Sequence, residues 1–389
     1  MRWDDVMHQD AALRRLEGAI AGGRLSHAYI FAGPEGVGKH MAARRLAQRI
    51  LCSAGTKRSD EGSNPQSAIL NPQSSDSALS TQHSALACGR CDDCLAVAAG
   101  THLDLHDIDR TMNRFHPDAT VRNRKAVDLG VDVIRHFVIE PAGVHPSRGR
   151  AKIFIIQEAE SMSPGAQNAL LKTLEEPPGA SYLMLLASSV EALLPTTRSR
   201  CQVVSFARLP DDFVRERLAA ATTLAEGEID YLTGLADGRL GVALKFAASG
   251  LHARRGDVLE LIGTAQHDPL AFGKAALDSV KSISRGETGA GDDDAAETES
   301  AETLSMRSAQ SLLLRMLTCG LRDILRVSTG LPPKAHTLEA ERVSQLAARF
   351  GRHGASRAIR AAASAESELE MNVNAGLVFD ALGIAMSRG

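Results

Sequence analysis

The sequence is poor in aromatic residues, in long apolar runs and in N-terminal hydrophobicity. Aromatic residues make up only 4% of the 389 residues although 44% are hydrophobic, a balance that is typical of a globular protein rich in helices. No run of about 18 or more apolar residues occurs, which argues against a helix that crosses a bilayer. Acids and bases are scattered through residues 1–20, where a signal peptide needs an apolar core, so we expect a cytoplasmic protein.

The sequence also lacks a surplus of either charge. It has 44 Lys and Arg residues against 47 Asp and Glu residues, which gives a formal net charge of -3. A chain this close to neutrality is not drawn strongly to nucleic-acid phosphate as a whole, because that attraction grows with the number of basic contacts. Any role at DNA must therefore be local or shared with partner proteins.

Cysteine is scarce but concentrated. Of the six cysteines, three lie within seven residues, at Cys88, Cys91 and Cys94. Disulfides are not the default in a protein that is not exported, so this spacing indicates a metal site. Tetrahedral zinc needs a fourth ligand, and Cys52 is the best candidate because only a Ser-rich segment separates it from Cys88. A structural zinc site is favoured over an iron–sulfur cluster, whose motif continues with Cys-Pro, and over free thiols.

Apolar runs alternate with helical patterns over the first part of the chain. The runs predict strands at 27–33, 103–109, 152–157, 182–188 and 202–206. Residues 130–140 have the spacing of an amphipathic helix, and Ser163 followed by Pro164 predicts the start of another helix that stops before Pro177. Strands that alternate with helices indicate an α/β domain with a doubly wound parallel sheet over residues 1–207.

After residue 207 the strand signals vanish. Short helices are predicted over 208–265 and further helices over 266–389, so we expect a small helical domain followed by a C-terminal helical domain. Two segments of low complexity interrupt the chain, the Ser-rich residues 53–87 and the acidic residues 286–303. Neither can bury enough apolar surface to join a core, so we expect a disordered insertion and a solvated acidic loop.

A glycine-rich loop follows the first predicted strand. Residues 33–40, Gly-Pro-Glu-Gly-Val-Gly-Lys-His, match the phosphate-loop pattern except at the last position. Gly33, Gly36 and Gly38 would let backbone N–H groups approach phosphates, and Lys39 would reach the outer phosphates of a nucleotide. The pattern and its place between a strand and a helix indicate a phosphate-loop fold. Binding of ATP or ADP and a vestigial loop both stay open at this point.

Two positions that should hold Mg²⁺ carry unsuitable residues. The loop should end in a hydroxyl residue, but His40 offers an imidazole, a poor ligand for a hard cation. An aspartate should follow the strand that ends near Ile156, but Gln157 stands there, and an amide does not supply the charge. Glu158 is then expected to make a structural hydrogen bond, because no metal would orient water beside it. Two defects in one metal site predict that this chain does not hydrolyse ATP.

A single arginine precedes the last predicted strand, in Ser199-Arg200-Cys201. An arginine at the edge of a sheet commonly forms a surface salt bridge. Alternatively, Arg200 reaches the ATP of a neighbouring subunit and stabilises the charge of the transition state, a role worth about 10³–10⁵ in rate. Periodicity alone does not choose between these interpretations.

Several stretches that include these motifs resemble the delta prime family of clamp-loader subunits of bacterial DNA polymerase III, which belongs to the AAA+ class. The run Asn-Ala-Leu-Leu-Lys-Thr-Leu-Glu-Glu-Pro-Pro at 168–178 is highly specific to clamp-loader subunits. The resemblance covers about residues 1–250. The matching stretches are 23–39, 88–94, 98–105, 152–178 and 196–201.

The resemblance implies a three-part subunit and a set of site residues. Residues 1–207 would form an AAA+ domain with a zinc module, 208–265 a helical lid and 266–389 a helical collar. Lys39 matches the phosphate-loop lysine of the motor subunits, and Arg200 matches the arginine that reaches the ATP site of the adjacent motor subunit. The implied ligands of a structural Zn²⁺ ion are Cys52, Cys88, Cys91 and Cys94.

The resemblance also implies partners and a role. The chain would join gamma/tau and delta subunits in a hetero-pentamer that loads the sliding clamp on primed DNA, within a DNA-directed DNA polymerase, or nucleotidyltransferase, holoenzyme. Because His40, Gln157 and Gly241 depart from the motor pattern, the implied role is a stator without its own ATP hydrolysis. Two alternatives stay open: a motor ATPase of the gamma/tau type, and a DNA-binding module that holds zinc or an iron–sulfur cluster.

Overall fold

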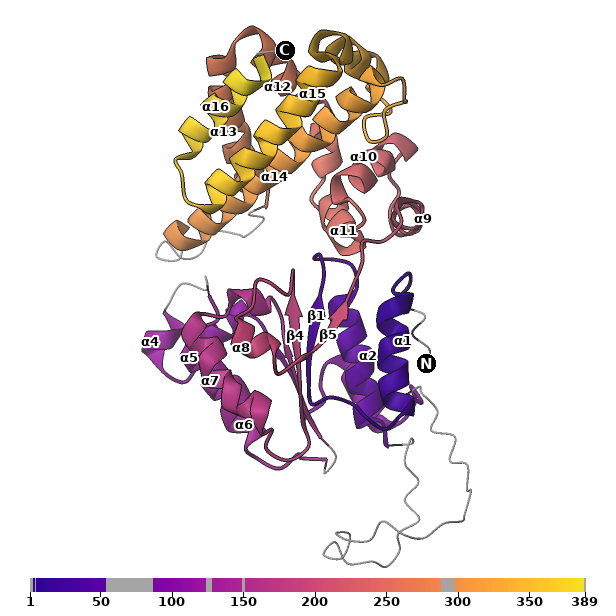
Figure 1. The fold of residues 1–389 in the computed structure, drawn as a ribbon, viewed down its shortest axis with the longest axis vertical. Helices are drawn as coiled ribbons and strands as arrows, with labels where there is room; N and C mark the ends of the chain where they lie inside the picture. The colour runs from indigo at the N-terminus through magenta and orange to yellow at the C-terminus, as the bar shows by residue number, and fades with distance from the viewer. Residues whose placement is uncertain are drawn as a thin grey trace, which may run out of the picture. The chain divides into compact units, whose positions relative to one another are not determined.

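The computed structural model describes residues 3, 5–53, 87–123, 128–148, 151–287 and 298–387. The chain divides into two compact units, Met1–Ala207 and Arg208–Gly389, which are described separately below (Figure 1). Apart from Ser53 and Ala87, the Ser-rich segment predicted to be a disordered insertion lies outside the described residues. Among the described residues, no helix combines the length and the apolar character needed to span a membrane.

The N-terminal unit is built on a five-stranded sheet in the order β2-β3-β4-β1-β5. All neighbouring strands pair in parallel, which confirms the predicted α/β fold class. Every residue of β1 and β3 is buried, as expected for central parallel strands with helices on both faces. The strands are β1 (Ala28–Ala32), β2 (Leu105–Ile108), β3 (Lys152–Ile156), β4 (Ser181–Ala187) and β5 (Gln202–Ser205).

Two apolar cores cover the two faces of this sheet, because alternate strand residues point to opposite sides. On one face, Tyr29 and Phe31 pack with Leu16 of α1 (Asp10–Ala21) and Leu46 of α2 (Lys39–Leu51). On the other face, the strands pack against α5 (Val131–Ile134) and α7 (Pro164–Glu175). Figure 1 shows α1 and α2 on one side of the sheet and α5, α7 and α8 (Pro195–Arg198) on the other.

Shorter helices complete the N-terminal unit. The helix predicted over 130–140 consists of α5, a π-helical turn and α6, and the side chain of Ser163 caps α7 by accepting a hydrogen bond from the amide of Ala166 at 3.2 Å, as predicted. The remaining elements are α3 (Asp92–Ala99), η2 (Arg110–Phe115), α4 (Ala119–Arg122), η3 (Arg135–Ile139), α6 (Glu140–Ala142) and η4 (Ala159–Ser161).

The C-terminal unit is helical throughout its described residues. Buried side chains from Leu209 to Met386 form one cluster, so the expected division into a lid over 208–265 and a collar over 266–389 stays a prediction. The helices are α9 (Asp211–Ala221), α10 (Glu226–Ala236), α11 (Leu240–Ala248), η5 (Leu251–Arg254), α12 (Arg255–His267), α13 (Pro269–Glu287), α14 (Thr298–Ser328), α15 (Ala340–Glu370) and α16 (Ala375–Ser387).

The expected acidic loop at 286–303 needs a correction at its ends. Helix α13 continues to Glu287 and α14 already begins at Thr298, while 288–297 lie outside the described residues. The acidic composition indicated solvation, but Ala and Glu are also good helix formers, and Glu299, Ala301 and Glu302 suit the start of α14.

Candidate functional site

The phosphate loop lies at the carboxyl edge of the sheet, between β1 and α2, where parallel α/β sheets bind ligands. Gly33, Gly36 and Gly38 have φ angles of 151°, 75° and 101°, which side-chain-bearing residues rarely adopt. A Cβ on Gly33 would lie 2.3 Å from the carbonyl oxygen of Phe206, so this position also requires glycine. The loop therefore has the backbone form that the sequence pattern predicts.

Lys39, the first residue of α2, turns back onto its own loop. Its Nζ donates hydrogen bonds to the carbonyl oxygens of Gly33 and Pro34, the latter at 2.7 Å. Burial lowers the pKa of Lys39, while the carboxylates of Glu160 and Glu35 oppose that effect. The loop lysine is thus held among backbone acceptors at the place where a phosphate-loop lysine meets phosphate.

The two residues that replace the usual magnesium ligands both contact Asp107. His40 Nε2 lies 2.5 Å from Asp107 Oδ2, and the side-chain amide of Gln157 donates to Asp107 Oδ1 at 2.7 Å. Burial raises the pKa of Asp107, but the hydrogen bonds from His40 and Gln157 and the His40 charge outweigh it, so the net pKa is lowered. Asp107 was not among the predicted site residues, although an acid near the end of a predicted strand was a usable signal.

Glu158, the acid that directly follows Gln157, also has a partner. Glu158 has a φ angle of 46°, in the left-handed region, and its carboxylate pairs with Arg110. Glu160 accepts a hydrogen bond from the amide of Ser188, just beyond β4, at 3.1 Å. The expectation that Glu158 has a structural partner agrees with this ion pair.

The structure brings the predicted cysteines together. The sulfurs of Cys52, Cys88, Cys91 and Cys94 all lie within 4.8 Å of one another. Two of the pairs, Cys52 with Cys91 and Cys88 with Cys94, are 3.9 Å apart. A tetrahedron of sulfurs about 2.3 Å from a central zinc has edges of about 3.8 Å, so this donor set fits a zinc ion.

Hydrogen bonds lower the pKa of some of these cysteines. The amides of Arg90 and Cys91 lower the pKa of Cys88, whereas burial raises the pKa of Cys94. Burial also raises the pKa of Cys91, but hydrogen bonds from Ser53 and from the Cys94 amide bring it down to about 5. Thiolates are the ligand form, so the lowered pKa values of Cys88 and Cys91 favour metal binding at these two positions.

Helix α2 connects the phosphate loop to the cysteine cluster. Cys52 is the residue that caps the C-terminus of α2. From the same helix, the buried Gln48 donates to the carbonyl oxygen of Cys94 at 2.8 Å, and Arg44 donates to that of Val97 at 2.5 Å. The phosphate loop and the cysteine cluster therefore lie at opposite ends of α2.

Arg200 lies apart from the phosphate loop and the cysteine cluster. It precedes β5, whose Gln202 pairs with Tyr29 near the start of β1, so Arg200 is at the amino edge of the sheet and the phosphate loop is at the opposite edge. Its Nε donates to Glu175 Oε1 at 2.7 Å, and its Nη1 donates to the carbonyl oxygen of Thr196 at 2.9 Å. The geometry does not direct Arg200 toward the chain's own phosphate loop.

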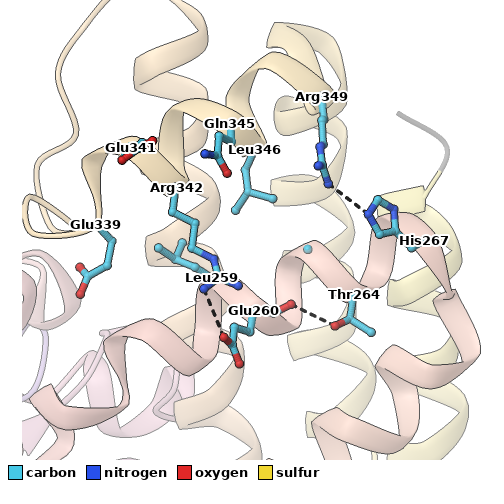
Figure 2. A pocket seen from close by; sticks show the side chains of 11 residues that line it. Leu259, Glu260, Thr264, His267, Glu339, Glu341, Arg342, Gln345, Leu346 and Arg349 are labelled. Atoms are coloured by element: carbon cyan, nitrogen blue, oxygen red, sulfur yellow. Dashed lines mark hydrogen bonds and ion pairs between the residues drawn. The ribbon is translucent and has the colours of Figure 1, made fainter.

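In the C-terminal unit, a groove of about 740 Å³ runs between α12 and the first part of α15 (Figure 2). Its basic side chains are already paired, Arg342 with Glu260 at 3.2 Å and Arg349 with His267 at 3.1 Å. Leu259 and Leu346 supply its apolar lining. Sequence reasoning did not find this groove, because its residues come from two separate helices.

These features define the class of the protein: an AAA+-like subunit with a phosphate loop, a four-cysteine cluster and a helical C-terminal unit. A family described as "DNA polymerase III, delta subunit" matches residues 8–79 and 74–210, slightly more than half of the chain. The chain belongs to this family of clamp-loader subunits; it is delta-prime-like and related to gamma/tau.

Individual relatives agree with that assignment. The chain is 30% identical over 246 residues to the delta' subunit of DNA polymerase III from Pseudomonas aeruginosa, covering 61% of this chain and 62% of that one. It is 28% identical over 284 residues to the tau subunit from Bacillus subtilis, covering 71% of this chain and 43% of that one. It thus spans less than half the length of that tau relative.

Among solved structures, a DNA polymerase III gamma subunit-related protein from Thermotoga maritima aligns with a TM-score of 0.43 at 16% identity. That alignment covers 97% of this chain and 99% of that one.

Proposed function

We propose that this chain is the delta prime, or stator, subunit of the clamp loader, which assists ATP-driven loading of the sliding clamp on primed DNA without hydrolysing ATP itself. The observation that carries the proposal is the engagement of His40 and Gln157 with Asp107. A motor subunit needs oxygen ligands for Mg²⁺ at the end of its loop and after its central strand. Here an imidazole and an amide N–H point at the Asp107 carboxylate instead.

The same contacts explain why hydrolysis is not expected. Without Mg²⁺, the charge that develops on the outer phosphates has no metal to neutralise it. Glu158, which could otherwise orient water, is paired with Arg110. The loop glycines and Lys39 can still cradle a phosphate, so bound ATP or ADP would have a structural role in this chain.

We propose that Arg200 contributes to catalysis at the ATP site of a neighbouring subunit. Its position at the amino edge of the sheet separates it from its own loop and leaves it partly exposed, with 32% of its side chain accessible. An arginine delivered in this way stabilises transition-state charge on the ATP of the adjacent subunit, and such arginines are worth about 10³–10⁵ in rate. Hydrolysis next door would then be coupled to release of the clamp.

The proposed cofactor of the cysteine cluster is one structural Zn²⁺ ion, held by Cys52, Cys88, Cys91 and Cys94. A four-thiolate site is closed, so the ion would stabilise the fold and would not act on a substrate. The cluster would fix the C-terminal end of α2 and, through this helix, the phosphate loop.

The proposed partners are gamma/tau and delta subunits, joined through the collar at 266–389 in a hetero-pentamer. The test is co-purification with these subunits, followed by clamp loading on primed DNA. The proposal expects a complex with one copy of this chain, and expects loading to fall to background when the chain is left out. A complex of the same composition that forms and loads clamps without the chain would refute it.

The second candidate function is a motor ATPase of the gamma/tau type, which the 28% identity to the Bacillus subtilis tau subunit over 284 residues favours. It requires the isolated chain to turn over ATP with Mg²⁺, and this turnover must be abolished by Lys39→Ala. Turnover at the background level in both proteins would exclude this alternative.

A further inference from the structure

We propose that Glu175 is a positioning residue that aims Arg200 at the neighbouring ATP site. This inference rests on the proposed role of Arg200. Glu175 is the last residue of α7, and Arg200 follows α8, so the pair joins two elements that are 25 residues apart in sequence.

The contacts hold the Arg200 guanidinium on both sides. Glu175 Oε1 accepts from both Nε and Nη2 of Arg200, which occupies one side of the planar group. On the other side, Nη1 donates to the carbonyl oxygen of Thr196 at 2.9 Å and to Ser199 Oγ at 3.3 Å. A guanidinium presents five N–H donors in a fixed fork, so these four contacts restrict its orientation and leave one N–H of Nη2 to meet a phosphate.

Buried contacts fix the two elements that carry the pair. Gln167 of α7, which is 3% exposed, accepts hydrogen bonds from the amide of Leu194 at 2.9 Å and from the hydroxyl of Thr197 at 3.3 Å. At the C-terminal end of α7, the ring of His27 lies 2.7 Å from the carbonyl oxygen of Leu174. The separation of Glu175 and Arg200 is therefore set by the core and not by the two side chains alone.

The Glu175–Arg200 ion pair is exposed enough for Arg200 to stay accessible to a partner's phosphate. The Glu175 side chain is 48% exposed and that of Arg200 is 32% exposed, and ion pairs in such settings contribute little net energy. A triphosphate carries more negative charge than one carboxylate and accepts charge-assisted hydrogen bonds from the guanidinium. Glu175 can thus limit the rotamers of Arg200 without competing strongly with the phosphate.

The test is the DNA-stimulated ATPase of the reconstituted loader with Glu175→Ala in this chain. We expect kcat to fall about tenfold with an unchanged KM for ATP, because misaligned catalytic groups lose rate more than binding. The conservative variant Glu175→Gln keeps an acceptor oxygen and should recover part of kcat. The adjacent, exposed Glu176→Ala is the matched control and should behave as wild type.

Two results would overturn the inference. The Arg200→Ala variant shows whether the proposed role of Arg200 has failed or only the positioning role of Glu175. If Arg200→Ala leaves the ATPase unchanged, the proposed function fails and this inference fails with it. If Arg200→Ala lowers the rate while Glu175→Ala leaves it unchanged or raises it, only the positioning role is refuted, and a raised rate would mean that Glu175 masks the arginine. Equal unfolding temperatures and equal assembly of the variants exclude a folding defect as the cause.

Discussion

His40 Nε2 lies 2.5 Å from Asp107 Oδ2, which joins the first turn of α2 to the end of β2. The contact lies where a magnesium ion would bind in an active phosphate-loop ATPase. Together with Gln157, His40 hydrogen-bonds the Asp107 carboxylate, so these three side chains satisfy one another without a metal ion.

Restoring the magnesium ligands should make the unfolding temperature depend on Mg²⁺. The double variant His40→Thr, Gln157→Asp supplies a hydroxyl and a second carboxylate beside Asp107, and the two like charges repel until a cation binds. We expect a lower unfolding temperature in Mg²⁺-free buffer than for wild type, with a rise when Mg²⁺ is added. Ligand at about 100 times its Kd contributes about 2.7 kcal/mol.

The control for that experiment is the wild-type chain, whose unfolding temperature should not change with Mg²⁺. Differential scanning calorimetry in chelator-free buffer, without and with millimolar Mg²⁺, measures both proteins. A wild-type protein that Mg²⁺ stabilises as strongly as the double variant would contradict the account of this site.

The lowered pKa of Asp107 predicts a stability difference that depends on pH. A carboxyl group with a folded-state pKa below its unfolded value of about 3.9 contributes stability above that value and loses it as pH falls through the folded pKa. Asp107→Asn should therefore cost about 1 kcal/mol at pH 7, and the difference from wild type should shrink below about pH 4. Urea unfolding at several pH values checks this, with the exposed Glu191→Gln as the control.

Loss of one thiolate should empty the metal site. In Cys91→Ser we expect less than stoichiometric zinc and a lower unfolding temperature, because a structural zinc site couples binding to folding. Elemental analysis of the purified protein measures the metal, and a brown visible spectrum would identify an iron–sulfur cluster instead. Cys201→Ser, outside the cluster, should keep its metal; one zinc per chain in Cys91→Ser would argue against the assignment.

Gln48 should support the cluster from α2. Gln48→Ala leaves the buried carbonyl of Cys94 without its 2.8 Å donor, and the loss of such outer contacts typically costs about 10–100-fold in metal affinity. Competition with a chromophoric chelator measures the affinity. Met41→Ala changes an exposed residue of the same helix and should leave it unaltered. Equal affinities for Gln48→Ala and wild type would show that α2 does not hold the metal site.

Much of the fold could be predicted because its signals are local. Buried apolar runs identified the strands, and Ser163 followed by Pro164 identified the start of α7. The cysteines could be grouped because a metal needs four ligands, whatever the length of the segment between Cys52 and Cys88.

The site contacts were not predictable in the same way. His40 and Asp107 are 67 residues apart, and they meet only because the loop and the end of β2 share the carboxyl edge of the sheet. Glu175 and Arg200 likewise depend on how α7 packs against α8. Neither the strand order nor helix packing is encoded in the spacing of single residues, so Asp107 and Glu175 escaped sequence reasoning.

The central claim is that this chain acts on the ATP of a neighbour through Arg200 and not on ATP of its own. The most direct measurement is the DNA- and clamp-stimulated ATPase of the reconstituted loader with Arg200→Ala in this chain alone. The account predicts an assembled complex whose stimulated ATPase falls at least about tenfold, because the neighbouring site loses an arginine of a kind worth about 10³–10⁵ in rate. An assembled complex with wild-type ATPase would contradict it.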